Sequence, residues 1–298
     1  QIASGYFGCR TSNGQFDPNR FEEQSTADQI KMIEIKLSQG AKPGHGGVLP
    51  GAKVTPEISE ARGIPVGVTC NSPPGHSAFS TPIEFVEFIQ QLRTLAGGKP
   101  VGFKLCVGHP WEFLALVKAM VETGITPDYI VVDGKEGGTG AAPMEFLNRI
   151  GTPLVEGLTF VHNALIGAGL RDRIRIGAAG KVITAFDIVW AMGLGADWCN
   201  SARGFMFALG CIQAQACHTN RCPVGITTQD PIRQRALVVE DKAERVAAFH
   251  LNTMKALAEV VSAAGLDSPA HFQSNMLQVR QKTGDVIPAN EAYPRLSE

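Results

Sequence analysis

The sequence has almost no net charge and no long apolar run. Its 298 residues carry 27 Lys and Arg against 28 Asp and Glu, a formal net charge of −1. Without a basic or acidic excess, the chain offers no electrostatic case for binding nucleic acid or an anionic membrane surface. No stretch reaches the about 18 apolar residues that cross a bilayer, so the sequence predicts no spanning helix.

The first residues also lack the features of a secretory signal peptide. The stretch QIASGYFGC has no basic start and no long apolar core. It has no initiating methionine and opens within an apparent strand, from which we expect the chain to be part of a longer protein. We expect a cytoplasmic location, with membrane tethering only through a segment in the missing part.

The seven cysteines do not form the pattern of a disulfide scaffold, because four are scattered singly and three are clustered. The cluster lies in GCIQAQACHTNRCPVG and consists of Cys211, Cys217 and Cys222. Thiolates are soft ligands for zinc and for iron–sulfur clusters. Three thiolates suit a three-iron cluster, which needs one for each iron. Zinc needs a fourth ligand, for which His218 is available. Small buried thiols are the third interpretation.

Short apolar runs alternate with helical patterns, which indicates βαβ units and a parallel sheet. An α/β chain of this size suits a (β/α)8 TIM barrel, although right-handed crossovers also allow a doubly wound sheet. Six strands are recognisable where a barrel needs eight, so about two are expected to precede residue 1. We predict one domain over 1–298. The predicted strands are near residue 2 and at 32–37, 101–107, 129–133, 174–178 and 197–202, and the predicted helices are 82–95, 110–123, 185–194 and 241–264.

Residues 39–78 are rich in Gly and Pro and too long for an ordinary connection, so they indicate a functional loop. Lys42 is its first cation, and Arg62 follows on a short helical segment. Such cations can clamp a dicarboxylate, although a solvated loop would carry them equally well.

Glycine-rich turns follow three of the late strands. Gly137 and Gly138 come after the strand YIVVD, and their backbone N–H groups can approach a ligand closely. Gly180 with Lys181, and then Arg203 with Gly204, follow the last two strands, where many barrels hold a phosphate. The alternative is that these glycines only form tight turns or helix N-termini and contact no ligand. Together the three turns favour a phosphate-bearing cofactor.

Lys104 lies inside the apolar strand GFKLCV, where a lone ammonium group is costly unless it reaches solvent or a partner. Such a cation beside a flavin would stabilise the reduced ring. The histidines look structural. His162 lies in an amphipathic helix, which indicates a core residue, and His45, His76 and His109 suggest loop or helix-start positions.

Taken together, the stretches LSQGAKPGHGGVLPGAKV, VVDGKEGGTGAAP and GCIQAQACHTNRCPVGITTQ resemble the FMN-binding domain of glutamate synthase over residues 1–265. The resemblance is closest to the stand-alone FMN-binding proteins of this family. It implies a barrel that holds FMN and a 3Fe-4S cluster. It also implies reduction of 2-iminoglutarate, formed from 2-oxoglutarate and ammonia, to L-glutamate, with electrons from a donor protein or subunit.

The resemblance also assigns roles to individual residues. Lys42 matches a lysine at the substrate carbonyl, and Arg62 matches an arginine that holds a substrate carboxylate. The cluster ligands would be the three cysteines at 211–222. The cofactor-binding positions implied are Gln1, Ser4, Lys104, Gly137, Gly138, Thr139, Gly180, Lys181, Arg203 and Gly204.

Two positions depart from the family pattern. Where glutamate synthases have Gly-Glu-Gly-Gly-Gln after Lys-Pro, this chain has His45 in place of the acid and Val48 in place of the glutamine that touches the oxo acid. A related flavoprotein acting on another 2-amino or N-methyl amino acid is therefore an alternative, as is a barrel that only binds or transfers electrons.

Overall fold

Five parallel strands form the central sheet of the computed structural model, which describes residues 1–42, 46–138, 142–294 and 296. Neighbours in the sheet follow one another along the chain, with no reversal of direction. This singly wound order is that of a (β/α)8 barrel, whereas a doubly wound sheet reverses at a switch point. The predicted α/β fold with a parallel sheet is confirmed. Across the sheet the strands are β1 (Ile33–Lys36), β4 (Val101–Leu105), β5 (Tyr129–Asp133), β6 (Arg175–Ala179) and β7 (Trp198–Asn200).

The strand predicted near residue 2 is shorter than expected. Ile2 makes a single parallel bridge to Ile35 on the outer side of β1, with Ile2 N donating to Glu34 O over 2.7 Å. The strand predicted at 197–202 is likewise reduced to the three residues of β7, because Ser201 and Ala202 already lead into the next helix.

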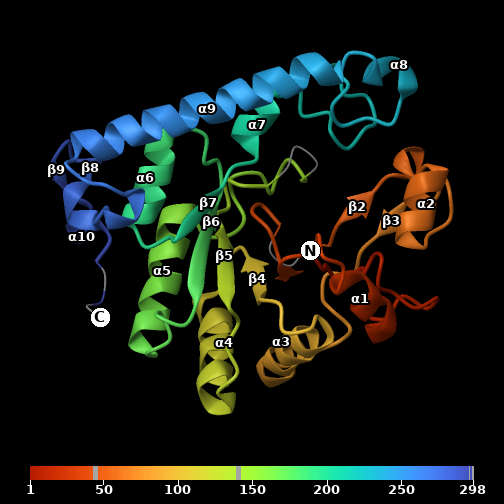
Figure 1. Ribbon diagram of the computed structural model, residues 1–298, viewed down its shortest axis with the longest axis horizontal. Coiled ribbons are helices and arrows are strands. Elements are labelled where there is room, and N and C mark those ends of the chain that lie inside the picture. Colours follow the sequence, from red (N-terminus) through yellow and green to blue (C-terminus); the bar gives the residue numbers. More distant parts are fainter. Residues whose placement is uncertain (43–45, 139–141, 295, 297–298) are drawn as a thin grey trace.

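Helices join the strands and pack along the sheet (Figure 1). Thr81 and Glu84 form a capping box at the start of α3. Pro110 opens α4, and the left-handed Gly124, with φ of 70°, ends it. The bounds of both helices match the prediction. The connecting helices are α3 (Pro82–Leu95), α4 (Pro110–Thr123), α5 (Leu154–Gly167) and α6 (Ala185–Gly193).

One hydrophobic cluster extends from Ile2 to Ala289 between the sheet and these helices. All five residues of β5 are buried, as expected for a strand covered on both faces. His162 of α5 is 1% exposed, and its Nδ1 accepts a hydrogen bond from Arg171 Nε over 3.1 Å. The interpretation of His162 as a core residue is confirmed.

Residues 39–78 are not the single irregular loop that their composition suggests. They contain β2 (Val48–Leu49) paired with β3 (Cys70–Asn71), the 3-10 turn η1 (Gly51–Lys53) and α2 (Pro56–Arg62). A Cβ on Gly51 would lie 2.2 Å from Gly67 O, so glycine permits the close approach that shapes this insertion. Glycine here serves backbone packing within a small ordered unit.

The C-terminal third is dominated by one long helix. The helix predicted at 241–264 is α9 (Val239–Ala263), which runs across the top of the view in Figure 1 and packs against α6 and the short α7. No helix in the described ranges is both long and apolar enough to cross a membrane. The remaining elements are α1 (Pro18–Ser25), α7 (Arg203–Ala208), α8 (Pro231–Gln234), β8 (Gln278–Arg280), β9 (Val286–Pro288), α10 (Ala289–Ala292), η2 (Pro269–His271) and η3 (Ser274–Met276).

Candidate functional site

A cavity of about 550 Å³ opens where the end of β1 meets the 39–78 insertion; we call it the cation cavity. Four of the residues predicted for the site line it, although they come from three separate stretches of the sequence. The fold therefore gathers them into one place. The lining includes Gln1, Ser4, Lys36, Lys42, Val48 and Arg62.

Lys42 is the buried cation of this cavity, with 8% of its surface exposed. Burial lowers the pKa of its amine, because the charged form loses its hydration. No carboxylate among the described residues forms an ion pair with Lys42. An uncompensated ammonium group in this position is costly, and an anionic ligand would offset the cost.

Arg62 lies in the last turn of α2, and its guanidinium group sits over the ring of Phe7, 4.7 Å from the ring centroid. Stacking of this kind fixes the plane of the guanidinium group and leaves its N–H edge for a carboxylate. In the described part of the chain no acidic side chain pairs with Arg62. Of the cations that line the cavity, Lys42 and Arg62 thus lack a protein anion in the described part of the chain.

The two N-terminal residues of the cavity are tied to their surroundings. Ser4 Oγ donates to Pro73 O over 2.6 Å, and the side-chain amide of Gln1 donates to the carboxylate of Glu34. These bonds hold the first residues of the chain against β1 and against the insertion, so the cavity wall is continuous between them.

Beside the cavity, charged side chains of β1, β4 and β5 form what we call the charge row, which consists of Glu34, Lys36, Lys104 and Asp133. Lys36 and Lys104 are register partners on neighbouring strands. Lys104 Nζ lies 3.8 Å from Glu34 Oε1, so the lysine predicted to need a partner has one. The carboxylate of Asp133 accepts the backbone N–H of Gly40 over 2.9 Å.

Lys36 also belongs to this site, although nothing in the sequence alone marked it as a site residue. Burial, together with the positive charges of Lys104 and Lys42, lowers the pKa of its amine to about 8, against the opposite effect of Asp133 and Glu34. The face on which it lies was predictable from MIEIKL, where Ile33 and Ile35 are the buried positions of β1. Period-two alternation places Glu34 and Lys36 together on the other face.

The glycine turn after β5 packs against the loop that carries Lys42. A Cβ on Gly138 would lie 2.8 Å from Gly40 O, and one on Gly137 would lie 2.1 Å from Asp133 Oδ1. These glycines are therefore required by close packing, against the Asp133 carboxylate for Gly137 and against backbone for Gly138. Thr139 and His45 lie outside the described residues.

The two turns predicted to share a phosphate line different cavities. Gly180 and Lys181 lie at a cavity of about 220 Å³ beside α6, and Lys181 Nζ donates to Asn148 Oδ1 over 2.8 Å. Arg203 lies instead at a cavity with the cysteines. A Cβ on Gly204 would lie 2.8 Å from the ring of Phe249, so this glycine admits α9.

The cysteine loop, residues 211–222, folds around a cavity of about 30 Å³ that all three of its cysteines line. Cys222 is buried, which by itself raises the pKa of its thiol, but hydrogen bonding from Thr227, Val224 and Ile226 lowers that pKa to about 7. Amide groups around sulfur favour the thiolate, the form that binds metal.

The loop does not have the arrangement of a single-metal site. Within the described ranges, no three His, Cys, Asp or Glu side chains are placed to share one metal ion, and His218 is exposed. A zinc centre completed by His218 is therefore not favoured. Ligands of a three-iron cluster are spread over three metals, so they need not converge on one point.

Comparisons with known proteins show the family of this chain. A family model described as the conserved region in glutamate synthase matches residues 1–267. The chain belongs to the glutamate synthase family. It is 44% identical over 287 residues to the glutamate synthase large subunit-like protein YerD of Bacillus subtilis, covering 96% of this chain and 54% of that protein.

Other members of the glutamate synthase family are more distant. The archaeal-type glutamate synthase [NADPH] of Thermotoga neapolitana is 35% identical, with 98% of this chain and 56% of that protein covered. The chain thus spans about half the length of the curated relatives it matches. Among solved structures, a flavocytochrome b2 mutant with pyruvate bound matches with a TM-score of 0.48 at 14% identity, over 90% of this chain and 54% of that one.

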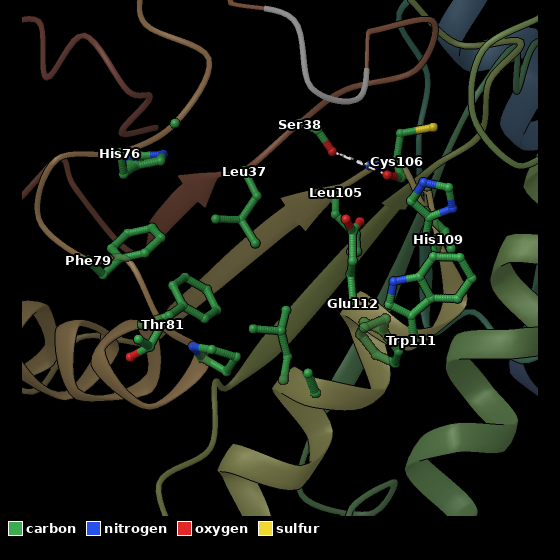
Figure 2. Close-up of a pocket in the computed structure, with 18 of the residues that line it drawn as sticks. Leu37, Ser38, His76, Phe79, Thr81, Leu105, Cys106, His109, Trp111 and Glu112 are labelled. Atoms are coloured by element: carbon green, nitrogen blue, oxygen red, sulfur yellow. Dashed lines mark hydrogen bonds between the residues drawn. The ribbon is translucent and has the colours of Figure 1, made fainter.

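This glutamate synthase family chain has a larger cavity, of about 720 Å³, between the first turns of α3 and α4 (Figure 2). Its walls are mainly apolar, with His109 stacked on Trp111 at a centroid distance of 4.3 Å. Ser38 and Cys106 lie at its inner end, where Cys106 N donates to Ser38 Oγ over 2.8 Å. The lining contains no lysine or arginine, so the cation cavity is the better site for a dicarboxylate.

Proposed function

We propose that this chain is the synthase portion of an FMN-dependent oxidoreductase that reduces 2-iminoglutarate, formed from 2-oxoglutarate and ammonia, to L-glutamate. The observation that carries the proposal is the cation cavity, where Lys42 and Arg62 have no carboxylate partner in the described part of the chain. Family membership supports the reaction type.

The substrate would be held at both ends. Arg62 offers a planar pair of N–H donors, which suits bidentate binding of a carboxylate. Lys42 is buried and offers an ammonium group to the oxygen or nitrogen at C2. Reduction places a hydride on C2 and a proton on nitrogen, so two electrons enter the product. A cation next to this centre would favour the charge that develops there.

The flavin would lie against the charge row. Lys104 and Lys36 are positive groups at the ends of adjacent strands, and Gly137 with Gly138 makes a side-chain-free turn beside them. FMN, when bound, would supply the hydride. Such cations beside a flavin stabilise its reduced, more negative form. Gly180, Lys181, Arg203 and Gly204 are the proposed positions for its phosphate, which would have to lie between the two cavities that their turns line.

The cysteine loop would hold a 3Fe-4S cluster that passes electrons to the flavin from a separate donor protein or subunit. Three thiols at one small cavity, with amide groups turned toward one of them, suit such a cluster. Thiol ligands of this kind belong with a reducing, cytoplasmic setting, which we propose as the location.

The test is the visible spectrum of the anaerobically purified protein, with iron, sulfide and zinc analysis and an assay of glutamate formation from 2-oxoglutarate, ammonium and a chemical reductant. We expect flavin bands over an iron–sulfur shoulder, about three irons per chain and glutamate. A colourless protein that holds zinc or no metal would overturn the proposal.

Val48 favours a second candidate, a flavoprotein that acts on another 2-amino or N-methyl amino acid. This residue is 52% exposed in the lining of the cation cavity and offers no hydrogen bond to an oxo acid. Val48→Gln should lower KM for 2-oxoglutarate by about fivefold, the effect of one added hydrogen bond of about 1 kcal/mol. An unchanged KM, with faster turnover of a less polar oxo acid, would favour the second candidate.

A further inference from the structure

One short segment, residues 46–53, touches both the cation cavity and the cysteine loop. Its beginning, at Gly46, Gly47 and Val48, lines the cavity. Its end, the turn η1, meets the cysteine loop through two hydrogen bonds. Lys53 Nζ donates to Cys217 O over 2.6 Å, and Asn220 Nδ2 donates to Ala52 O over 3.2 Å. The two sites are therefore mechanically joined.

The backbone that carries Lys53 is well fixed. Lys53 N donates to Pro50 O over 2.9 Å, and Gly67 N donates to Val54 O over 3.1 Å. Val54 itself is 4% exposed and anchors the end of the turn. A long side chain that leaves an ordered turn loses less freedom when it is held in one place. Lys53 is thus presented to the cysteine loop from a rigid base.

The ammonium group of Lys53 reaches the cysteine loop at the backbone oxygen of Cys217. In the described residues no Asp or Glu pairs with Lys53. Lys53 therefore adds a positive charge beside the cysteine loop, next to the cavity that Arg203 lines together with the cysteines.

We propose that Lys53 is a positioning residue for an iron–sulfur group at the cysteine loop, holding Cys217 in place and stabilising the reduced form of the group. The inference rests on the proposed function only for the presence of that group. Reduction adds one electron from a one-electron donor and breaks no bond, so the group gains one negative charge. A nearby ammonium group stabilises that charge and raises the reduction potential.

The experiment compares Lys53→Met with Lys53→Arg in the anaerobically purified protein. Iron and sulfide are counted, and the midpoint potential is measured by dye-mediated titration followed by EPR. Lys53→Met keeps the length of the side chain and removes the charge, so the potential should become more negative. Lys53→Arg keeps the charge and should restore it. Lys118→Met, which removes an exposed lysine paired with Glu122, is the matched control.

Asn220→Ala removes the second hydrogen bond to the segment, together with the bonds that Asn220 Oδ1 accepts from Thr228 Oγ1 and Gln229 N, and leaves the ammonium group of Lys53 in place. It should leave the potential near that of the wild type. If Lys53→Met loses iron while Lys53→Arg keeps it, the result supports the role of Lys53 in holding Cys217 in place. An unchanged potential in iron-loaded Lys53→Met, or iron loss in both Lys53 variants, would overturn the proposal.

These readouts do not depend on glutamate formation. A wild-type protein that holds iron and sulfide but makes no glutamate would sink the proposed function and leave the role of Lys53 open to the same measurement. A wild-type protein without iron and sulfide would overturn the role of Lys53 directly.

Discussion

The cation cavity and the charge row share Lys36, but their other charged side chains differ in whether they have a partner of opposite charge. In the charge row, Lys104 is paired with Glu34 at 3.8 Å, and Asp133 lies close enough to act on both lysines. In the cation cavity, Lys42 and Arg62 have no protein anion among the described residues. An ion pair offsets the desolvation of its two charges. A buried charge without a partner raises the free energy of the folded protein until an anionic ligand binds.

The largest effect that would sharpen this contrast is expected at Lys42. Lys42→Met should lower turnover by at least about 100-fold, the usual loss when a group that stabilises the reacting centre is removed. The same change should leave the melting temperature equal or higher, because it removes a buried charge without a partner. Steady-state kinetics and a thermal melt check both halves, with Lys118→Met as the exposed control. Undiminished turnover would take Lys42 out of the site.

At Lys36 the effect should depend on pH. Its pKa in the folded protein is about 8, below its ordinary 10.5, so between these values the unfolded chain binds more protons and stability rises with pH. Lys36→Met should therefore be more stable than the wild type near pH 7, by at most about 3 kcal/mol. The groups that face Lys36 are Lys104, Lys42, Asp133 and Glu34.

Urea unfolding at a pH of about 7 and again at about 10 measures this difference. The gap between Lys36→Met and the wild type should shrink at the higher pH, where the wild-type amine is neutral in the folded state. A gap that stays constant or grows would show that Lys36 does not carry a desolvated charge.

Glu34 tests the paired side of the comparison. Glu34→Gln leaves Lys104 without its anion and should cost about 1–3 kcal/mol, the penalty for an unsatisfied polar group that is only partly exposed. Adding Lys104→Met to this variant should recover part of the loss, since the lysine that lost its ion-pair partner is then removed. Chemical unfolding of the four members of this cycle gives the coupling energy. Strictly additive losses would contradict the pairing.

The smallest effect should come from Arg62→Lys. The substitution keeps a positive charge but loses the planar pair of donors and the stacking on Phe7. We expect KM for the dicarboxylate to rise by about tenfold, equivalent to about 1.4 kcal/mol, with little change in stability. Equal KM values for the two proteins would mean that Arg62 supplies charge and no directed hydrogen bonds.

The bounds of a helix can be predicted from the sequence where residues at its two ends mark the start and the stop. The helices at 82–95 and 110–123 were predicted with the bounds they have, because Thr81 with Glu84, Pro110 and Gly124 mark their ends. The inner structure of residues 39–78 was not predictable in this way. It depends on contacts between distant glycines, such as Gly51 and Gly67, and on a β pairing only two residues long.

In the candidate site, too, some features are recognisable from the sequence and others depend on the fold. Lys42 and Arg62 were recognised through the family resemblance, and the cavity that contains both came only with the fold. Lys36 was visible in the alternation of its strand, but its significance depends on Lys104, which is 68 residues away in sequence and opposite in register. Cross-strand register is set by packing of the whole sheet, so no local pattern reveals it.

The order of the strands has one further consequence. In the described chain, β7 pairs with β6 alone, and β1 meets only the single residue Ile2 on its other side. The unpaired backbone N–H and C=O groups at the two edges of the sheet can pair with a strand of another chain, which leads to association or aggregation. The segment that covers these two sheet edges, whether from the same polypeptide or from another, therefore determines whether copies of the molecule associate through their sheets.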